Sequence, residues 1–253
     1  MKILFTLLAL TITFSMNAQM STNSTTNFGT HSSAAGHATS ADGDYSTAIG
    51  VGATASGLAS TAIGWNTTAN GGASTVMGKE TIASDYASTV IGQYNSSGSS
   101  ATSATSFSTS APAFVIGNGT NSSNKSDAFK VLFNGDATVS NDLTVSGDVV
   151  VSSDARLKSN IVSLGSTLSR LLLIDGKSYE MKGKQKIGVL AQDIKEVFPE
   201  LVTEDDNEML AVNYQGLVPV LINALKEQDK KMKDQDDKIS RLENLVEKLI
   251  SNK

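Results

Sequence analysis

The chain of 253 residues contains no cysteine, no excess of basic residues and, after its first residues, no long hydrophobic run. The absence of cysteine excludes disulfides, thiol catalysis and zinc-thiolate sites, and it also excludes a lipid anchor attached through cysteine. The net charge of −5 provides no basic surface for nucleic acid and argues against non-specific binding to anionic lipid. We therefore expect no nucleic-acid partner, and the length suits one or two ordinary domains.

The first residues have the pattern of an export signal. Lys2 supplies the positive end, residues 3–14 form an apolar run too short to span a bilayer, and residues 17–19 fit a processing region. We therefore expect residues 1–19 to be a signal peptide. No later segment is long and apolar enough for a membrane helix, so we expect an exported protein without a transmembrane anchor, secreted or held at the cell surface.

A five-residue motif recurs with a fixed period in the first half of the chain. Copies such as Ser-Thr-Ala-Ile-Gly begin at residues 46, 60, 74 and 88, which are 14 residues apart, and a weaker copy occupies residues 32–36. A second column at the same period contains Ala41, Ala55, Ala69 and Ala83. An exact period with glycine at one fixed place indicates a solenoid of stacked coils.

The alternation of side chains along a strand predicts which residues of each coil face inward. It places Thr47 and Ile49 on one face of the strand and Ala48 on the other. We expect the larger apolar residues to stack as a thin core, and glycine to allow the turn at each corner. A coil of 14 residues cannot bury a core alone, so coils must stack and chains are expected to associate. The predicted core column consists of Ile49, Ile63, Met77 and Ile91.

Residues 29–98, with their Ser-x-Ala-Ile-Gly core and period of 14, resemble the head of YadA-like trimeric adhesins. The resemblance implies a left-handed parallel β-roll in which three chains pack side by side, and we assign residues 20–98 to this roll. A flat threonine array for ice or sugar is an alternative, but the threonines share a face with the apolar column, which favours packing. We expect His31 and His37 to be exposed linker residues. The threonine column consists of Thr47, Thr61, Thr75 and Thr89.

Residues 99–152 form a predicted connector. Residues 96–110 are rich in serine and threonine, which is typical of a loop or linker. Three later segments, residues 113–119, 128–135 and 143–151, are β-branched or aromatic and end at turn signals. We expect short antiparallel strands in these segments and no functional site.

The last third of the chain changes to a charged, aliphatic pattern. Residues 187–219 predict a strand, a helix that stops before Pro199, another strand and then a long helix. Spacings of three and four between apolar residues indicate a coiled coil over residues 218–250. Gln228 and Gln235 are polar residues in its seam and are expected to fix register or chain number. The seam consists of Val218, Leu221, Leu225, Gln228, Met232, Gln235, Ile239, Leu242, Val246 and Leu249.

The border between the two compositions is the six-residue segment Ser153-Asp154-Ala155-Arg156-Leu157-Lys158. A serine hydroxyl is a weak nucleophile that needs a base, and both histidines lie far upstream in the repeats. A lysine can be that base if burial lowers its pKa. On an α-helix, two side chains five residues apart point about 140° apart around the helix axis, so they do not share a face. Ser153 must therefore lie at or before the helix start with Lys158 leaning back, or Lys158 must act on a neighbouring chain.

An alternative interpretation of this border is an ordinary helix N-terminus, with Ser153 or Asp154 as the cap and cations on an exposed face. Arg156 and Gln192 are better interpreted as structural residues that hold the junction or a strand end than as catalytic ones.

Together with four downstream motifs, the junction resembles the C-terminal intramolecular chaperone of endosialidase tailspikes and related fibres. The resemblance runs over about residues 152–227. It implies a self-cleaving serine peptidase domain that trimerises, folds the fibre ahead of it and then cuts itself off. By this resemblance the cut lies between Ser152 and Ser153, Ser153 is the nucleophile and Lys158 is the base. The matching segments are Ser153-Asp154-x-Arg156-x-Lys158-x-x-Ile161 and residues 188–193, 198–202 and 212–219.

We therefore expect a mainly β N-terminal part, a trimeric β-roll, and an α+β C-terminal domain at residues 153–227 that ends in a trimeric coiled coil. The expected protein is a secreted homotrimeric fibre that releases its chaperone once, without metal or cofactor. One alternative is the same trimer left uncleaved as a permanent clamp. Another is a module that binds a cell-surface or glycan ligand. A phage tail fibre is a third, although a signal peptide favours export by a cell.

Overall fold

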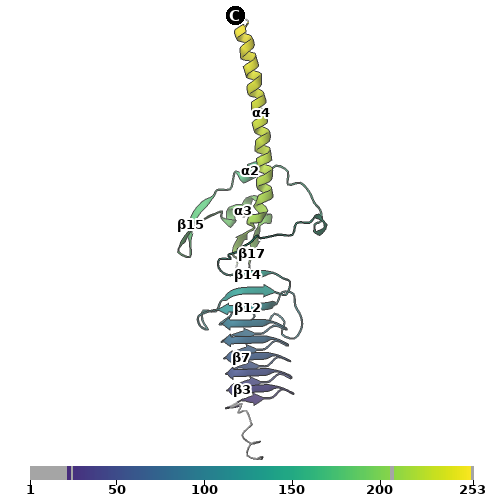
Figure 1. Ribbon diagram of the computed structural model, residues 1–253, viewed down its shortest axis with the longest axis vertical. Coiled ribbons are helices and arrows are strands. Elements are labelled where there is room, and N and C mark those ends of the chain that lie inside the picture. Colours follow the sequence, from purple (N-terminus) through teal and green to yellow (C-terminus); the bar gives the residue numbers. More distant parts are fainter. Residues whose placement is uncertain (1–21, 24, 206–207, 252–253) are drawn as a thin grey trace, which may run out of the picture. The chain divides into compact units, whose positions relative to one another are not determined.

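The computed structural model describes residues 22–23, 25–205 and 208–251, so the predicted signal peptide at residues 1–19 lies outside the described part. The described chain divides into two compact units, one that ends at Val149 and one that begins at Val150. The first unit is a β-solenoid, and the second is a small α+β region that ends in a long helix (Figure 1). The predicted fold class is confirmed in these terms.

Each repeat of the first unit contributes one long and one short strand, and the strands stack into two parallel sheets. Register follows the period of the sequence, so that Ile49 pairs with Ile63 and Ile63 pairs with Met77. The long-strand sheet starts with β1 (Thr22–Asn23), β3 (Ser33–His37), β5 (Thr47–Val51), β7 (Thr61–Trp65), β9 (Thr75–Lys79) and β11 (Thr89–Gln93). The short-strand sheet contains β2 (Thr26–Asn27), β4 (Ser40–Ala41), β6 (Thr54–Ala55), β8 (Thr68–Ala69) and β10 (Ile82–Ala83).

The interior of the roll is lined by small side chains, which corrects the predicted core column. Ala48, Ala62 and Val76 are fully buried, whereas Ile49, Ile63 and Met77 are 42%, 36% and 41% exposed. The alternation was predicted correctly, but the two faces were exchanged. The long strand and the short strand of one coil lie so close together that only alanine, valine and small polar side chains fit between them. The larger residues therefore lie on the outer face of the long-strand sheet.

Glycine permits the close stacking of the coils. Gly50 has a φ of +130°, and a Cβ atom placed on it would lie 2.0 Å from the carbonyl oxygen of Gly64 in the next coil. Glycine alone combines this φ with so close an approach. The fixed glycine of each motif thus sets the distance between coils as well as the corner.

The roll ends with strands that follow the last repeat. β12 (Pro112–Asn118) pairs in parallel with β11, and then antiparallel with β13 (Asp127–Leu132). β13 pairs antiparallel with β14 (Ala137–Val139). The predicted strand at residues 143–151 is wrong, because this segment has no strand in the structure and its residues are exposed. Its β-branched residues have no strand of their own chain to pair with.

Side chains close the short-strand sheet beyond β10. The Asn95 amide accepts a hydrogen bond from Ile82 N over 2.8 Å and donates one to Ile82 O over 2.9 Å, in place of a further strand. The Asp127 carboxylate accepts from the backbone N–H groups of Ser96 and Ser97. These bonds satisfy the sheet edge and fix the start of the loop at residues 96–110.

The described part of the second unit contains two hairpins, two short α-helices, three short 3-10 helices and one long α-helix. Its buried core consists of Ile194, Phe198, Leu201 and Val220. The predicted strand, helix and strand before the long helix are confirmed, and α3 ends at Val197, before Pro199. The elements are η1 (Ala155–Leu157), α2 (Leu168–Leu171), β15 (Lys177–Met181), β16 (Lys184–Gly188), α3 (Ala191–Val197), η2 (Pro199–Leu201), β17 (Val202–Glu204), β18 (Leu210–Val212), η3 (Tyr214–Gly216) and α4 (Leu217–Ser251).

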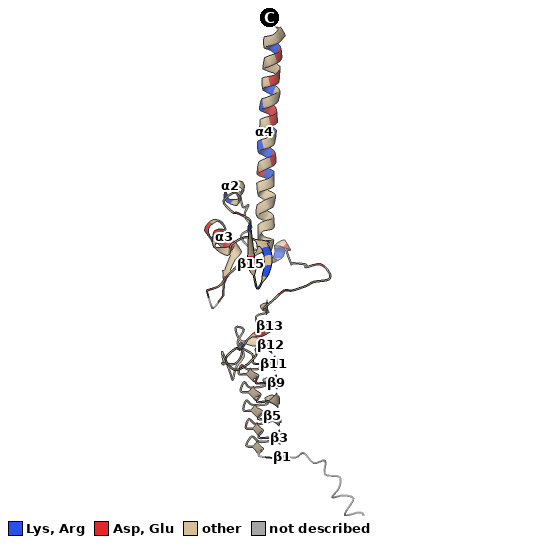
Figure 2. Cartoon of the chain, turned by 90° about the vertical axis from the view of Figure 1, so that its left-hand side faces the viewer, with Lys and Arg blue, Asp and Glu red and all other residues tan. Residues whose placement is uncertain are grey.

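The long helix α4 leaves its apolar seam uncovered within the chain. Val220 and Ala224 are its buried residues, and both lie in its first turns. Lys and Arg residues are interspersed with Asp and Glu residues along the rest of the helix (Figure 2). In the part of the chain that the structure describes, we find no helix with the length and apolarity needed to cross a bilayer. The exposed apolar seam residues are Val218, Leu221, Leu225, Met232, Ile239, Leu242, Val246 and Leu249.

Candidate functional site

The junction at the start of the second unit forms a single tight turn. The 3-10 helix η1 begins at Ala155, and Asp154 is its N-cap. Leu157 N donates to Asp154 O and Lys158 N donates to Ala155 O, each over 3.1 Å. The helical turn begins two residues after Ser153, so the residue that follows the turn, Lys158, comes back toward Ser153.

This turn brings the two predicted site residues together. Lys158 Nζ donates a hydrogen bond to Ser153 Oγ over 2.7 Å. Sequence spacing required Ser153 to precede the helix start if the pair were to meet within one chain, and Ser153 does precede it. The arrangement within one chain therefore needs no residue from a neighbour to form the contact. Nζ is the donor in this bond, and a neutral amine at the same distance could instead accept the hydroxyl proton.

Asp154 and Arg156 form a second contact beside this pair. The Asp154 carboxylate accepts from Arg156 N over 2.9 Å and from Arg156 Nη2 over 2.6 Å. The hydrogen bonds from the Arg156 side chain, and then from its backbone, lower the pKa of Asp154. The same side-chain bond raises the pKa of Arg156. The carboxylate thus stays ionised and remains an acceptor for both donors.

The whole junction is exposed in a single chain. Ser152, Ser153 and Lys158 are exposed, and Val150 is 89% exposed although it is apolar. The role inferred for the lysine from the sequence needs burial, which a single chain does not supply at this place. The contact is formed, but its surroundings are those of a surface turn.

A carboxylate of α4 holds the chain that follows the junction. Glu227 accepts hydrogen bonds from Ser166 Oγ over 2.6 Å, from Leu168 N over 3.1 Å and from Thr167 N. The bond from Ser166, followed by the bond from Thr167, lowers the pKa of Glu227. Thr167 is buried and donates through Oγ1 to Val220 O over 2.9 Å. The start of α2 is therefore tied to the first turns of α4.

Sequence reasoning missed Glu227. The partners lie about 60 residues apart in the chain, and a glutamate on a heptad helix looks like part of its solvated face. The one available signal was the pair Ser166 and Thr167 before an apolar run, which is typical of a helix N-terminus that needs acceptors.

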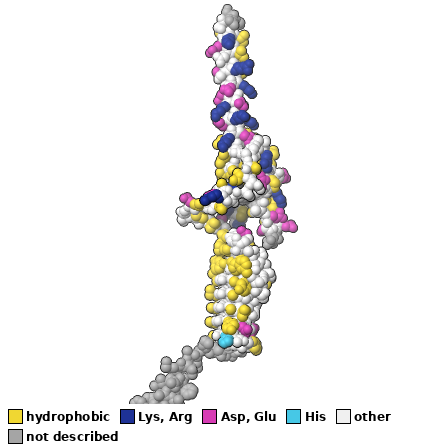
Figure 3. Space-filling model, turned by 90° about the vertical axis from the view of Figure 1, so that its right-hand side faces the viewer, with side chains coloured by type: hydrophobic (Ala, Val, Ile, Leu, Met, Phe, Trp, Pro, Cys, Tyr) yellow, Lys and Arg dark blue, Asp and Glu magenta, His cyan; other side chains and the backbone are white. Residues whose placement is uncertain are grey.

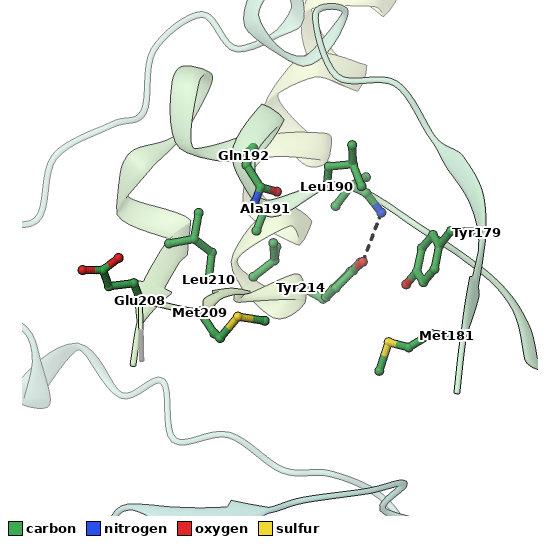
Figure 4. Close-up of a pocket in the computed structure, with 11 residues that line it drawn as sticks. Tyr179, Met181, Leu190, Ala191, Gln192, Glu208, Met209, Leu210 and Tyr214 are labelled. Atoms are coloured by element: carbon green, nitrogen blue, oxygen red, sulfur yellow. Dashed lines mark hydrogen bonds between the residues drawn. The ribbon is translucent and has the colours of Figure 1, made fainter. Parts of the chain in front are cut away.

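A separate pocket of about 370 Å³ lies between the two hairpins and α3 (Figure 4). Tyr179, Met209 and Gln192 line it, and the Tyr214 hydroxyl accepts from Val189 N over 3.2 Å. Two of the downstream motifs therefore meet here, and Gln192 lies in the pocket rather than at the junction. The lining is mainly apolar and contains neither Ser153 nor Lys158. Among the described residues, no group of three or more potential ligands is placed to hold a metal ion.

Comparisons with known proteins identify two kinds of domain in the chain. Residues 29–53, 41–67 and 55–81 match the YadA head domain repeat, and residues 153–203 match the family described as the chaperone of endosialidase. Both resemblances drawn from the sequence are confirmed, and the second match includes Ser153 and Lys158. No curated protein matches the chain. The matches support a trimeric fibre or adhesin-like protein.

Proposed function

We propose that this chain is an exported fibre whose C-terminal unit assembles three chains and then cuts the Ser152–Ser153 bond once. The observation that carries the proposal is the 2.7 Å contact between Lys158 Nζ and Ser153 Oγ, within the match to the endosialidase chaperone family. The substrate is the chain's own backbone, so each chain reacts a single time. The two matched domain types also favour an extracellular or surface location.

The proposed chemistry is an acyl shift followed by hydrolysis. Ser153 Oγ attacks the carbonyl carbon of Ser152 while its proton passes to the neutral Lys158 Nζ. The Ser152–Ser153 C–N bond then breaks, and Nζ returns the proton to the Ser153 nitrogen. This leaves an ester between the Ser152 carbonyl and Ser153 Oγ. One water hydrolyses the ester, which gives a carboxyl group on Ser152 and restores the Ser153 hydroxyl.

Two uncovered apolar surfaces support the proposed assembly. The outer face of the roll carries Ile49, Ile63 and Met77 in one column, and hydrophobic side chains gather along a face of the roll (Figure 3). The seam of α4 is the second surface. Contiguous exposed apolar surface of this kind is typical of protein interfaces. Three chains that pack through these surfaces would bury both of them.

Assembly also supplies a reason for cleavage to wait. Lys158 is exposed in one chain, so the burial that its proposed role as a base needs is absent there. Packing of chains around the junction would remove water from Lys158 and favour the neutral amine. Cleavage would then follow trimerisation.

The test is the mass of the chain from residue 20 onward, measured under denaturing conditions after purification as a trimer. We expect two products that meet at Ser152–Ser153, and one full-length product in Ser153→Ala. Lys158→Arg is the sharpest second variant, because arginine can reach and donate to Ser153 but cannot give up its proton. Ser152→Ala is the matched control, since it alters a neighbouring serine and leaves the nucleophile in place, and we expect it to be cut.

The uncleaved trimer is the second candidate, and the exposure of the junction favours it. In that case the coiled coil is a permanent clamp, and η1 is an ordinary turn with Asp154 as its cap. A full-length product from a trimeric parent, identical to those of Ser153→Ala and Lys158→Arg, would support the clamp.

A further inference from the structure

The junction poses a geometric problem that Ser153 and Lys158 cannot solve by themselves. If residues 153–158 were extended, their Cα atoms would span about 17 Å. A lysine side chain cannot bridge that distance. The 2.7 Å contact between Lys158 Nζ and Ser153 Oγ therefore exists only while the intervening turn is formed.

The turn formed by η1 has few stabilising interactions of its own. A 3-10 helix of three residues is marginal by itself, because few hydrogen bonds offset the loss of backbone freedom. η1 buries no residue, so packing within the chain does not stabilise it. Its two backbone hydrogen bonds are both 3.1 Å long. Besides the Lys158–Ser153 contact itself, the other hydrogen bonds of the turn are those of the Asp154 carboxylate.

Asp154 holds the turn through both of its oxygens. Oδ1 accepts from Arg156 N over 2.9 Å, which caps the first turn. Oδ1 also accepts from Arg156 Nε over 3.0 Å, and Oδ2 accepts from Arg156 Nη2 over 2.6 Å. This two-pronged contact is the strong form of a guanidinium–carboxylate pair. One carboxylate thus joins the backbone and the side chain of the same turn.

We infer that Asp154 and Arg156 are positioning residues for the proposed cleavage: Asp154 fixes the turn that brings Lys158 to Ser153, and Arg156 occupies Asp154 so that its carboxylate does not capture Lys158. The inference rests on the proposed function. The charged groups on the turn are Asp154, Arg156 and Lys158. Asp154 and Lys158 flank the same short turn, so without Arg156 the Asp154 carboxylate would be free to pair with Lys158, and an opposite charge nearby favours the charged form of an amine.

The two residues therefore have different signatures. Asp154→Ala removes the cap, so fewer chains hold the reactive geometry at any pH. We expect cleavage to slow by between about 10- and 100-fold, because a misplacement of about 1 Å can cost about 100-fold. Asp154→Asn should slow it less, since the amide oxygen can still accept from Arg156 N. Arg156→Ala should slow cleavage at neutral pH, and the cleavage rate of this variant should return toward that of the parent as the pH rises.

The experiment uses chains from residue 20 onward that are prepared unfolded and uncleaved, then refolded at a series of pH values. Intact mass gives the cleaved fraction over time, and light scattering on the same samples gives the amount of trimer. Asp175→Ala is the matched control. Asp175 and Lys177 form an exposed ion pair with the same spacing of two residues, outside the junction, and removing it should leave the rate unchanged.

The outcomes separate this inference from the proposed function. If the parent cleaves and trimeric Asp154→Ala cleaves at the parent's rate, the positioning role is overturned while the proposed function stands. If the parent trimer never cleaves, both are overturned. Should Asp154→Ala fail to assemble, Arg156→Ala decides: a rate restored at higher pH supports the inference, and a pH profile identical to the parent's overturns it.

Discussion

The roll and the C-terminal unit bury different kinds of apolar residue. The roll buries alanine and valine in every coil, and each coil completes the next through backbone hydrogen bonds in register. The C-terminal unit buries Ile194, Phe198, Leu201 and Val220, and leaves the whole seam of α4 exposed. The roll thus buries its small residues and leaves a column of larger ones on its outer face, whereas the second unit leaves the apolar seam of its longest helix exposed. This difference agrees with a fibre that is built by a separate assembly domain.

The largest effect should come from breaking the stacking of the roll. In Gly50→Ala, the new Cβ would lie 2.0 Å from Gly64 O, and neither coil can move without losing its hydrogen bonds. We expect a loss of about 4 kcal/mol or more in the stability of the roll. Thermal unfolding followed by circular dichroism measures it. Gly147→Ala is the control, because a Cβ at Gly147 meets no atom within 4 Å; equal losses in both variants would contradict the stacking account.

The next largest effect should come from the seam of α4. Leu242→Ser removes an exposed apolar side chain that the trimer is expected to bury, which is worth about 1.5–3 kcal/mol per chain. We expect the trimer to dissociate at more than tenfold higher concentration, as sedimentation would show. Leu245→Ser changes an exposed leucine of the same helix that lies outside the seam, and we expect a smaller effect. A reversed order would place the interface on another face.

A smaller pair of effects separates the two faces of the roll. Ala62→Leu enlarges a fully buried side chain, and overpacking of this kind costs about 1–3 kcal/mol. Ile63→Ser changes the next residue, which points outward, so we expect the roll to keep its unfolding temperature at low concentration while the trimer weakens. Unfolding and light scattering on both variants test this. Weakened folding in Ile63→Ser together with an unaffected Ala62→Leu would return the core to the isoleucine face.

The smallest effect concerns the hold of α4 on the start of α2. Because hydrogen bonds lower the pKa of Glu227 in the folded state, its contribution to stability is present above the pKa of the unfolded chain. That contribution is lost as the pH falls through the lower folded value. We expect Glu227→Gln to remove this part of the acid dependence of unfolding. An acid dependence unchanged in the variant would show that Glu227 does not contribute in this way.

The period, the glycine column and the long helix were predictable because each is a local pattern that repeats. The side of each long strand that faces the interior was not predictable. Alternation fixes which residues share a side of the strand, but it leaves open which side is inward. Isoleucine is more apolar than alanine, and only the width of the coil, known from the structure, reverses the choice at Ile49 and Ala48. The strand expected at residues 143–151 was wrong because strand propensity needs a partner strand.

At the site, the family resemblance pointed to Ser153 and Lys158, and sequence spacing stated the condition for their contact. The structure adds the turn that lets the two residues meet, with Asp154 as its N-cap and Arg156 bound to the Asp154 carboxylate. It also adds Glu227, whose partners are too distant in the sequence for any pattern to reveal. The local contact between Ser153 and Lys158 could thus be anticipated from the sequence, and contacts across the fold could not.

The most direct test of the central claim is the intact mass of the trimer under denaturing conditions, for the parent beside Lys158→Arg. We predict two masses in the parent that together equal the full chain plus one water and divide it at Ser152–Ser153, and a single full-length mass in the variant. A parent that assembles as a trimer and gives only the full-length mass would contradict the claim.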